Sequence, residues 1–234
     1  MTPTSAPTPS PATPPLTARP SPRARRATTV LWVAAPVLFL VSHLVVERAW
    51  SPPYSWARNM ISDLGNVGCG PWGDERRLVC SPLHALMNAA MIGTGLALVA
   101  GVVLTWRLWP SARARAGRAL VAAGGLGWVV AGSVPADVDE NTHVVLGAFP
   151  VLVLTNLGLL LVGLSRGRGP GRTRVLAAVC GATGLAGAAL LLAQVDLGLG
   201  LGGTERVAAL PPMIWMVAVG CAAPHADRRP RDGA

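Results

Sequence analysis

Hydrophobic residues fall in six long runs along the chain, separated by polar connectors. The runs cover residues 29–46, 82–106, 119–134, 143–164, 175–195 and 207–223. A helix needs about 20 apolar residues to cross the hydrocarbon core of a bilayer, and five of the runs reach or approach that length. The third run is shorter and reaches it only by extending a few residues at either end. The pattern predicts an all-α, polytopic membrane bundle of six transmembrane helices.

Polar segments flank this hydrophobic region at both ends. Residues 1–28 contain eight prolines among Thr, Ser and Ala, together with several arginines, and this composition cannot form a packed core. We therefore expect a disordered cytoplasmic tail at 1–28 and a second cytoplasmic tail at 225–234. Between them we expect a six-helix transmembrane domain at 29–224, with an outer loop at 48–81.

Arginine is distributed unevenly between the two sides that these spans define. All 20 basic residues are arginine, and fifteen of them, with only two acids, lie in the two tails and in the second and fourth connectors. That side carries +13, whereas five arginines and nine acids give the other side −4. Positive residues stay cytoplasmic. Both termini are thus expected inside (N-in, C-in), in a multi-pass protein of the cell membrane.

The basic excess does not indicate nucleic-acid binding. The formal net charge is +9, but the charge follows the cytoplasmic connectors, where it orients the protein and contacts anionic membrane lipids. Hydrophobic residues make up 51% of the chain and charged residues only 13%, which is too little polar sequence to cover a soluble core. Nothing in this pattern fixes the oligomeric state.

The outer loop contains the most unusual polar sequence, YSWARNMISDLG at 54–65. Ser62 and Asp63 either cap a short interfacial helix or belong to a reactive site. In the second case Asp63 is a carboxylic acid at the membrane boundary, where desolvation raises its pKa and lets it donate a proton. Cys69 and Cys80 follow, and they form either a disulfide in the oxidising exterior or two free thiols.

Polar residues also mark the outer ends of the spans. Ser81, His84 and Asn88 are three and four residues apart, so they share one helix face that is expected to point into the bundle. They either hydrogen-bond between helices or line a site. Three further pairs are close in sequence and could also line a site. The alternative for His43 and Glu47 is an interfacial anchor, and for Glu205 and Arg206 it is a structural ion pair. Asp139 and His143 are four residues apart, and the alternative for the acids there is to cap the start of the fourth span.

Four segments carry a resemblance: YSWARNMISDLGNVGCGPW, SPLHALMNAAMIGTG, VPADVDENTHVVLG and GLGGTERVAALPPMIW. Together they resemble the six-span bacterial and archaeal membrane family catalogued as domain of unknown function 998, over about residues 30–222. The resemblance implies a six-helix membrane fold and brings no established reaction. The positions that match the family's pattern best are Tyr54, Asn59, Ser62, Asp63, Leu64, Gly65, His84, Asn88, His143, Glu205 and Arg206.

These residues favour an enzyme with an outward-opening site that acts on a lipid or isoprenoid-like substrate by acid–base chemistry, in a cyclisation, isomerisation or hydrolysis. Asp63 is the expected acid, His84 the base or orienting group, and His143 a further catalytic residue. No cofactor is expected. The residues expected to bind the small lipophilic substrate are Tyr54, Asn59, Ser62, Asn88, Glu205 and Arg206.

Two alternatives stay open. A zinc hydrolase within the bilayer would draw its ligands from His43, His84, His143, Asp63 and Ser81, although no H-x-x-x-H pair is present and the last span has no histidine. A non-enzymatic transporter subunit, sensor or accessory protein would use the acidic outer side instead. The acids lie near span ends and not at mid-span, which argues against proton-coupled transport.

Overall fold

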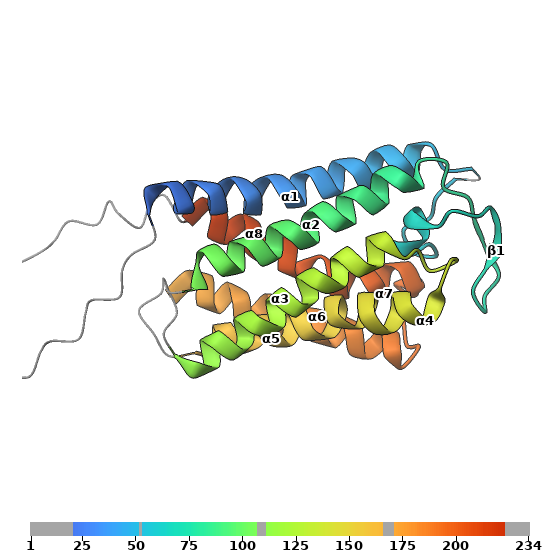
Figure 1. Ribbon diagram of the computed structural model, residues 1–234. Coiled ribbons are helices and arrows are strands. Elements are labelled where there is room, and N and C mark those ends of the chain that lie inside the picture. The colour runs from blue at the N-terminus through green and yellow to red at the C-terminus, as the bar shows by residue number, and fades with distance from the viewer. Residues whose placement is uncertain (1–20, 52, 107–110, 166–170, 223–234) are drawn as a thin grey trace, which may run out of the picture.

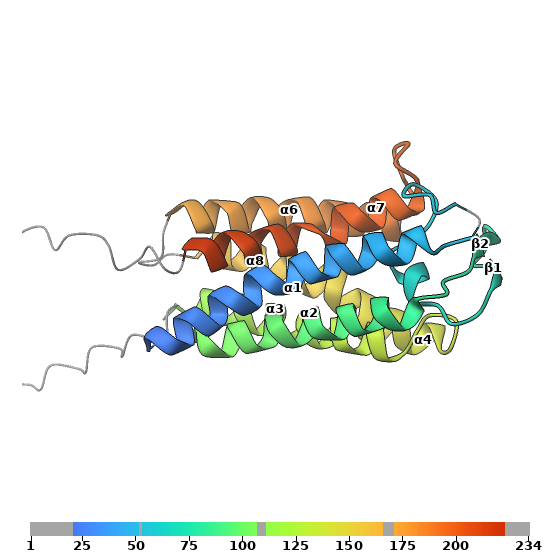
Figure 2. The same cartoon turned by 90° about the horizontal axis from the view of Figure 1, so that it is seen from above.

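The computed structural model describes residues 21–51, 53–106, 111–165 and 171–222. Long helices run side by side along one axis (Figures 1 and 2). Four of them are continuous, namely α1 (Pro22–Arg48), α2 (His84–Leu104), α3 (Ala112–Ser133) and α6 (Gly171–Leu192). The outer loop lies at the end of the bundle opposite to the start of α1 (Figure 1).

Two further helical segments are interrupted. The α4–α5 segment consists of α4 (Glu140–Thr142), the π-helices η3 (His143–Ala148) and η4 (Pro150–Leu154), and α5 (Thr155–Gly163). The α7–α8 segment consists of α7 (Gly200–Ala209) and α8 (Pro211–Ala222).

Proline accounts for both interruptions. Pro150 has no N–H to donate and its ring crowds the preceding turn, so the backbone around it widens. Pro211 and Pro212 separate α7 from α8 for the same reason. Pro212 leaves the Ala208 carbonyl without its usual donor, and the side chain of Asn156 from α5 donates to that oxygen instead, at 2.8 Å. Pro36 lies inside α1 without ending it.

The outer loop contains short elements of its own. These are the 3₁₀ turn η1 (Ser62–Gly65) and the strands β1 (Gly70–Trp72) and β2 (Arg77–Val79). The strands pair antiparallel, with Trp72 opposite Arg77. The all-α prediction omitted this hairpin, because strands of three residues are too short to show an alternating pattern.

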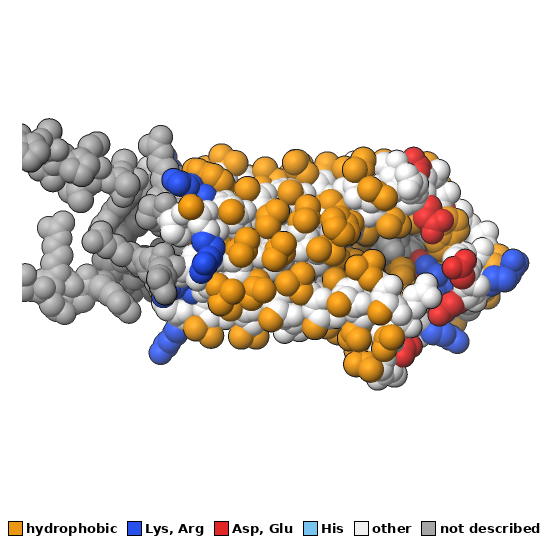
Figure 3. Space-filling model, turned by 90° about the horizontal axis from the view of Figure 1, so that it is seen from below, with side chains coloured by type: hydrophobic (Ala, Val, Ile, Leu, Met, Phe, Trp, Pro, Cys, Tyr) orange, Lys and Arg blue, Asp and Glu red, His pale blue; other side chains and the backbone are white. Residues whose placement is uncertain are grey.

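Five helical segments in the described part of the chain are long and apolar enough to cross a membrane: Arg26–Arg48, His84–Leu104, Glu140–Gly163, Gly171–Leu192 and Gly200–Ala222. Helix α3 has a similar length, but three arginines and several glycines lower its hydropathy. Apolar side chains cover the middle of the surface, and charged side chains gather at its ends (Figure 3). The protein is therefore a helical membrane protein.

Two helices extend beyond the hydrophobic runs. Helix α1 begins at Pro22, within the predicted disordered tail, because proline fits the first helical position and the arginines that follow favour a helix. Helix α7 begins at Gly200, ahead of the predicted run at 207–223, so Glu205 and Arg206 lie inside a helix and not at its mouth. Residues 1–20 and the predicted tail at 225–234 lie outside the described residues.

The buried core has an inner and an outer part. In the inner part the rings of Trp32 and Trp215 lie 5.0 Å apart. The outer part includes Phe39 of α1 and also Ile61 and Leu64 of the outer loop, all fully buried. Because loop residues are as buried as helix residues, the outer loop forms part of the folded bundle.

Candidate functional site

Arg206, in the second turn of α7, holds the outer loop against the bundle. Its Nη1 donates to the carbonyl oxygens of Trp56 and Asn59, each at 2.9 Å, and of Gly202 at 2.7 Å. The side chain is only 6% exposed. A buried guanidinium is tolerated because its donors are taken up by such acceptors.

The other side of the same guanidinium contacts side chains. Its Nη2 donates to the hydroxyl of Tyr54 and to Nε2 of His43, at 3.2 Å for the latter. Since Arg206 can only donate, His43 Nε2 must accept, which leaves the proton of a neutral imidazole on Nδ1. That nitrogen lies 3.3 Å from Oε2 of Glu47, which also accepts from the indole of Trp56 at 2.9 Å.

We refer to Arg206, His43, Glu47, Tyr54, Trp56 and Asn59 as the cap network. The Arg206 guanidinium also stacks over the Trp56 ring, 4.7 Å from its centroid. The Tyr54 hydroxyl donates to the Met60 carbonyl at 2.7 Å. Burial raises the pKa of Tyr54, and the nearby Arg206 charge only partly opposes this. The hydroxyl therefore stays protonated and available as a donor.

Two glycines allow α7 to approach the loop this closely. The amide of Gly202 donates to the Ala57 carbonyl at 2.8 Å. A Cβ atom at Gly202 would lie 2.8 Å from the Trp56 carbonyl oxygen, which leaves no room for a side chain. Gly200 has a φ of +72°, a left-handed conformation that glycine adopts without strain.

Asp63 forms a bidentate ion pair with Arg77 of β2. Both distances, Oδ2 to Nε and Oδ1 to Nη2, are 2.7 Å, and Oδ2 also accepts from the Met60 amide at 2.9 Å. Asp63 is 1% exposed. Burial disfavours the charge of Arg77, but the hydrogen bonds and charge of Asp63 outweigh it and raise the pKa of Arg77. In all these contacts Asp63 is the acceptor, whereas its predicted role is that of a proton donor.

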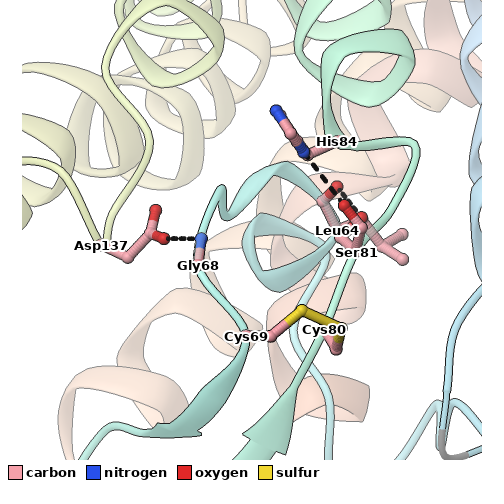
Figure 4. Close-up of a disulfide and its surroundings, with 7 residues drawn as sticks. All are labelled: Leu64, Gly68, Cys69, Cys80, Ser81, His84 and Asp137. Atoms are coloured by element: carbon pink, nitrogen blue, oxygen red, sulfur yellow. Dashed lines mark hydrogen bonds between the residues drawn. A yellow bond between two sulfur atoms is a disulfide. The ribbon is translucent and has the colours of Figure 1, made fainter.

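A disulfide joins Cys69 to Cys80 and closes the hairpin (Figure 4). The strands that it links carry Arg77 to its contact with Asp63. On the other side, the amide of Gly68 donates to Oδ2 of Asp137 at 2.6 Å, which ties the loop to the start of the α4–α5 segment. The disulfide therefore stabilises the hairpin that holds Arg77 against Asp63.

The polar face at the start of α2 is used to hold η1. The Ser81 hydroxyl donates to the Leu64 carbonyl at 2.7 Å, and Asn88 Nδ2 donates to the Gly65 carbonyl at 3.0 Å. His84 Nδ1 contacts the Ser81 carbonyl at 3.0 Å, and its outer edge points away from η1 (Figure 4). These side chains lie beside the outer loop and do not line the cleft described next.

A cleft of about 530 Å³ lies between the α4–α5 segment, the end of α6 and the start of α7, and we refer to it as the outer cleft. Figure 3 looks onto this face, which is hollowed towards its outer end. Its walls are largely apolar. The polar and charged residues that line it are Ser62, Asp74, Glu75, Arg77, Glu140, His143, Gln194, Asp196, Thr204 and Glu205.

His143 presents a basic nitrogen to this cleft. Its Nδ1 lies 2.7 Å from the Val134 carbonyl oxygen, which can only accept, so Nδ1 carries the proton and Nε2 has a free lone pair. The π-helical turn places His143 and Ala148, five residues apart, on the same face of the cleft. The Asp139 carboxylate does not pair with the His143 ring. It accepts from the Thr142 amide, which lowers the pKa of Asp139, while the Asp139 carbonyl oxygen accepts from the His143 amide at 2.9 Å.

Glu205 supplies a carboxyl group to the same place. It is 8% exposed, and its Oε2 accepts from the Ile61 amide. No described arginine forms a salt bridge with it, since the guanidinium of Arg206 points to the cap network. A second cavity of about 30 Å³ adjoins the outer cleft, and Ser62, His143 and Glu205 line both. The Glu205 carboxyl group and the His143 imidazole thus line the same cleft and the same adjoining cavity.

Comparison of the sequence with known protein families gave a match. A family model described as "Protein of unknown function (DUF998)" matches residues 33–222. The chain belongs to the DUF998 family. The match runs from α1 to the last residue of α8, so it includes every helix that contributes to the cap network and the outer cleft. No curated protein and no solved structure matches the chain.

The zinc ligands named from the sequence do not come together in this DUF998 protein. His43 is bonded to Arg206, and Asp63 is bonded to Arg77. Across the residues that the structure describes, no three His, Cys, Asp or Glu side chains are grouped as a metal site would require. The donor set therefore does not fit a zinc centre.

Some of the predicted site residues of this DUF998 protein hold the outer loop in place, and others line the outer cleft. Tyr54, Asn59 and Arg206 belong to the cap network, Asp63 pairs with Arg77, and His84 and Asn88 lie beside η1. Ser62, His143 and Glu205 line the outer cleft. Sequence reasoning missed Arg77 and Asn156. The signal for Asn156 was available, because a polar residue in an apolar run usually has a partner in the bundle.

Proposed function

We propose that this protein is a six-span enzyme of the cell membrane that acts on a lipid or isoprenoid-like molecule in the outer cleft by acid–base chemistry. The observation that carries the proposal is the placement of His143 and Glu205 on a shared cavity beneath apolar walls. Exposed Val144, Phe149 and Val195 border the cleft on the side that faces lipid. A lipophilic molecule can therefore enter from the bilayer without crossing water.

The two side chains have complementary roles. The lone pair on His143 Nε2 accepts a proton from the substrate, and the carboxyl group of Glu205, when protonated, returns one at another atom. Such an exchange leaves the substrate isomerised or cyclised, or hydrolysed if a water molecule is the group activated by His143. The imidazolium and carboxylate then reset by proton transfer. The adjoining cavity of about 30 Å³ has room for roughly one water molecule that would carry this proton.

The proposal moves the acid from Asp63 to Glu205. The contacts of Asp63 with Arg77 and the Met60 amide stabilise its charged form, which cannot donate a proton. Glu205 accepts from the backbone amides of Ile61 and Ser62 and has no described ion pair. His143 keeps the catalytic role that the sequence predicts.

The six-span topology, with both termini cytoplasmic, takes α3 as the remaining span. Its deepest arginine, Arg118, is buried, and its guanidinium donates to the carbonyls of Thr105 at 2.6 Å and Val102 at 3.0 Å. These are carbonyls at the C-terminal end of α2, where the helix dipole favours a cation. Reporter fusions placed after α2 and after α3 should lie on opposite sides of the membrane; the same side for both would exclude α3 as a span.

Isotope incorporation tests the enzymatic proposal without knowledge of the substrate. The purified protein, reconstituted with a bacterial lipid extract in D₂O and H₂¹⁸O, should introduce deuterium (isomerisation, cyclisation) or ¹⁸O (hydrolysis) into specific lipids, which mass spectrometry detects. The His143→Gln variant should introduce neither. Equal labelling by both proteins, or labelling by neither, would contradict the proposal.

A further inference from the structure

Acidic side chains from three separate elements surround the mouth of the outer cleft. Asp74 and Glu75 lie in the turn between β1 and β2, Glu140 begins α4, and Asp196 lies between α6 and α7. These residues are far apart in the sequence, so only the fold brings their charges to one opening. All four are exposed.

Positive charge does not balance this rim. Arg77 is the one basic residue among the residues that line the cleft in the described structure, and its charge is already paired with Asp63. Arg76 lies on the hairpin turn, exposed to solvent and outside the lining. With Glu205 at the floor, five carboxyl groups therefore face a cleft that offers no unpaired arginine.

The interior also points to a ligand. His143 is 4% exposed and lines the cleft, and among the described residues only Nδ1 of its ring has a side-chain hydrogen bond partner. The cleft volume of about 530 Å³ falls within the range of roughly 300–1,000 Å³ that is usual for small-molecule sites. A chain can thus lie along the apolar walls while a polar head stays at the acidic rim.

We infer that the outer cleft binds a membrane amphiphile with a cationic ammonium head, rather than an anionic phospholipid or an isoprenoid diphosphate. The inference rests on the proposed function, which makes the cleft the substrate site. Carboxylates attract an ammonium group and repel a phosphate over several ångströms, and the low dielectric of the nearby bilayer strengthens both effects. The head lies between the hairpin turn and α4, and the hydrocarbon chain follows the walls inwards.

Photo-crosslinking tests the inference with the full chain in micelles of a non-ionic maltoside detergent, whose head carries neither an ammonium nor a phosphate group. Three diazirine probes share one alkyl chain and differ only in the head, which is a trimethylammonium, a phosphate or a hydroxyl group. Peptide mapping should place the ammonium probe at 144–153 and 190–195, with about tenfold more labelling than the phosphate probe. Raised salt should reduce the difference. Excess tetramethylammonium should not compete, since it has no chain to bury.

Three variants serve as matched comparisons. Glu140→Gln with Asp196→Asn removes two rim charges and should lower the ammonium-to-phosphate ratio about tenfold. Asp139→Asn removes one charge next to Glu140, outside the cleft lining, and keeps a residue that caps helices well; the ratio should change less than twofold. Ala148→Trp fills the cleft and should abolish labelling by all three probes.

The outcomes separate the inference from the proposed function. Preference for the ammonium probe that falls in the rim variant supports both. Equal or stronger cleft labelling by the phosphate probe overturns the cationic head but leaves the cleft as a lipid site. If no probe labels the cleft, or if Ala148→Trp changes nothing, the cleft is not an amphiphile site and both are contradicted.

Discussion

Glu205 and Arg206 are neighbours in the sequence, but their side chains serve two different regions of the molecule. Arg206 points into the cap network, where its guanidinium donates to three carbonyl oxygens, a hydroxyl and an imidazole. Glu205 lines the outer cleft and accepts only from backbone amides, those of Ile61 and Ser62. Both terminal nitrogens of Arg206 are bonded within the protein, whereas the Glu205 carboxyl group lies beside a cavity.

This difference in hydrogen bonding separates polar residues that stabilise the fold from polar residues that could react with a substrate. A polar group whose partners all lie in the protein stabilises the fold, and substrate could reach it only by displacing them at a cost. A buried polar group beside a cavity can bind or react without that loss. On this criterion the cap network and the Asp63–Arg77 pair hold the outer loop in place, while His143 and Glu205 are the proposed reactive pair.

Replacing Arg206 should give the largest effect on stability. Arg206→Met leaves buried carbonyls, the Tyr54 hydroxyl and His43 Nε2 without their donor, which should cost at least about 3 kcal/mol. The melting temperature in detergent should fall by roughly 6–12 °C. Arg206→Lys should not restore it, because a single ammonium cannot donate in two directions to the same partners. Arg58→Gln, an exposed arginine of the same loop, is the control and should melt as the wild type does.

His143→Gln should show the opposite pattern. Loss of the basic nitrogen should reduce isotope incorporation by about 10²–10⁴-fold, the usual contribution of a general acid or base. The melting temperature should stay close to that of the wild type, because only the bond to the Val134 carbonyl is altered. If His143→Gln unfolds the protein and Arg206→Met leaves both fold and activity intact, the assignment of the two regions is reversed.

The Asp63–Arg77 pair provides a sharper test, because sequence and structure assign Asp63 differently. A double-mutant cycle of Asp63→Asn and Arg77→Gln should give a coupling energy of about 1–3 kcal/mol, as expected for a buried bidentate pair. The matched cycle of Glu75 and Arg77 should give almost none, since Glu75 is exposed. Thermal unfolding in detergent measures both.

Activity then decides the role of Asp63. If the structural role is its only one, Asp63→Asn and Arg77→Gln should reduce isotope incorporation to the same degree, following the loss of folded protein. If Asp63→Asn abolishes incorporation while the protein melts normally and Arg77→Gln remains active, Asp63 is the proton donor that the sequence predicts.

The hydrophobic runs of the sequence were sufficient to identify a helical membrane protein. Periodicity also placed Ser81, His84 and Asn88 on one face, since spacings of three and four residues follow from helix geometry. The hairpin and its ion pair were beyond such reasoning. Arg77 and Asp63 are fourteen residues apart in a loop without periodic pattern, and only the register of two short strands brings them together.

The sequence also did not show which of the predicted residues line the cleft and which hold the outer loop. A motif shows that Glu205 and Arg206 are adjacent, but the direction of each side chain depends on the helix turn in which it lies. Helix α7 begins at Gly200, whose left-handed backbone conformation is not visible as hydropathy. His143 lines the cleft because a π-helix replaces the α-helix there, and that widening arises from Pro150 and its surroundings.

The smallest of these effects concerns Tyr54, the one tyrosine of the chain. Burial raises its pKa, so the phenol contributes stability at pH values below the ordinary pKa of about 10. That contribution is lost as the pH rises through the folded pKa, because the tyrosinate cannot donate to the Met60 carbonyl. Ultraviolet absorbance of tyrosinate reports this group alone, and its midpoint should lie above that of the denatured protein.

Two variants test whether the burial of Tyr54 in the cap network causes its raised pKa and the loss of stability at high pH. Tyr54→Phe removes the signal and should also remove the loss of thermal stability between neutral pH and pH values above about 10. Trp72→Phe alters an aromatic residue at the outer cleft and should leave the Tyr54 midpoint unchanged. A midpoint equal in folded and denatured protein would mean that Tyr54 is solvated, and its place in a buried hydrogen-bonded network would be contradicted.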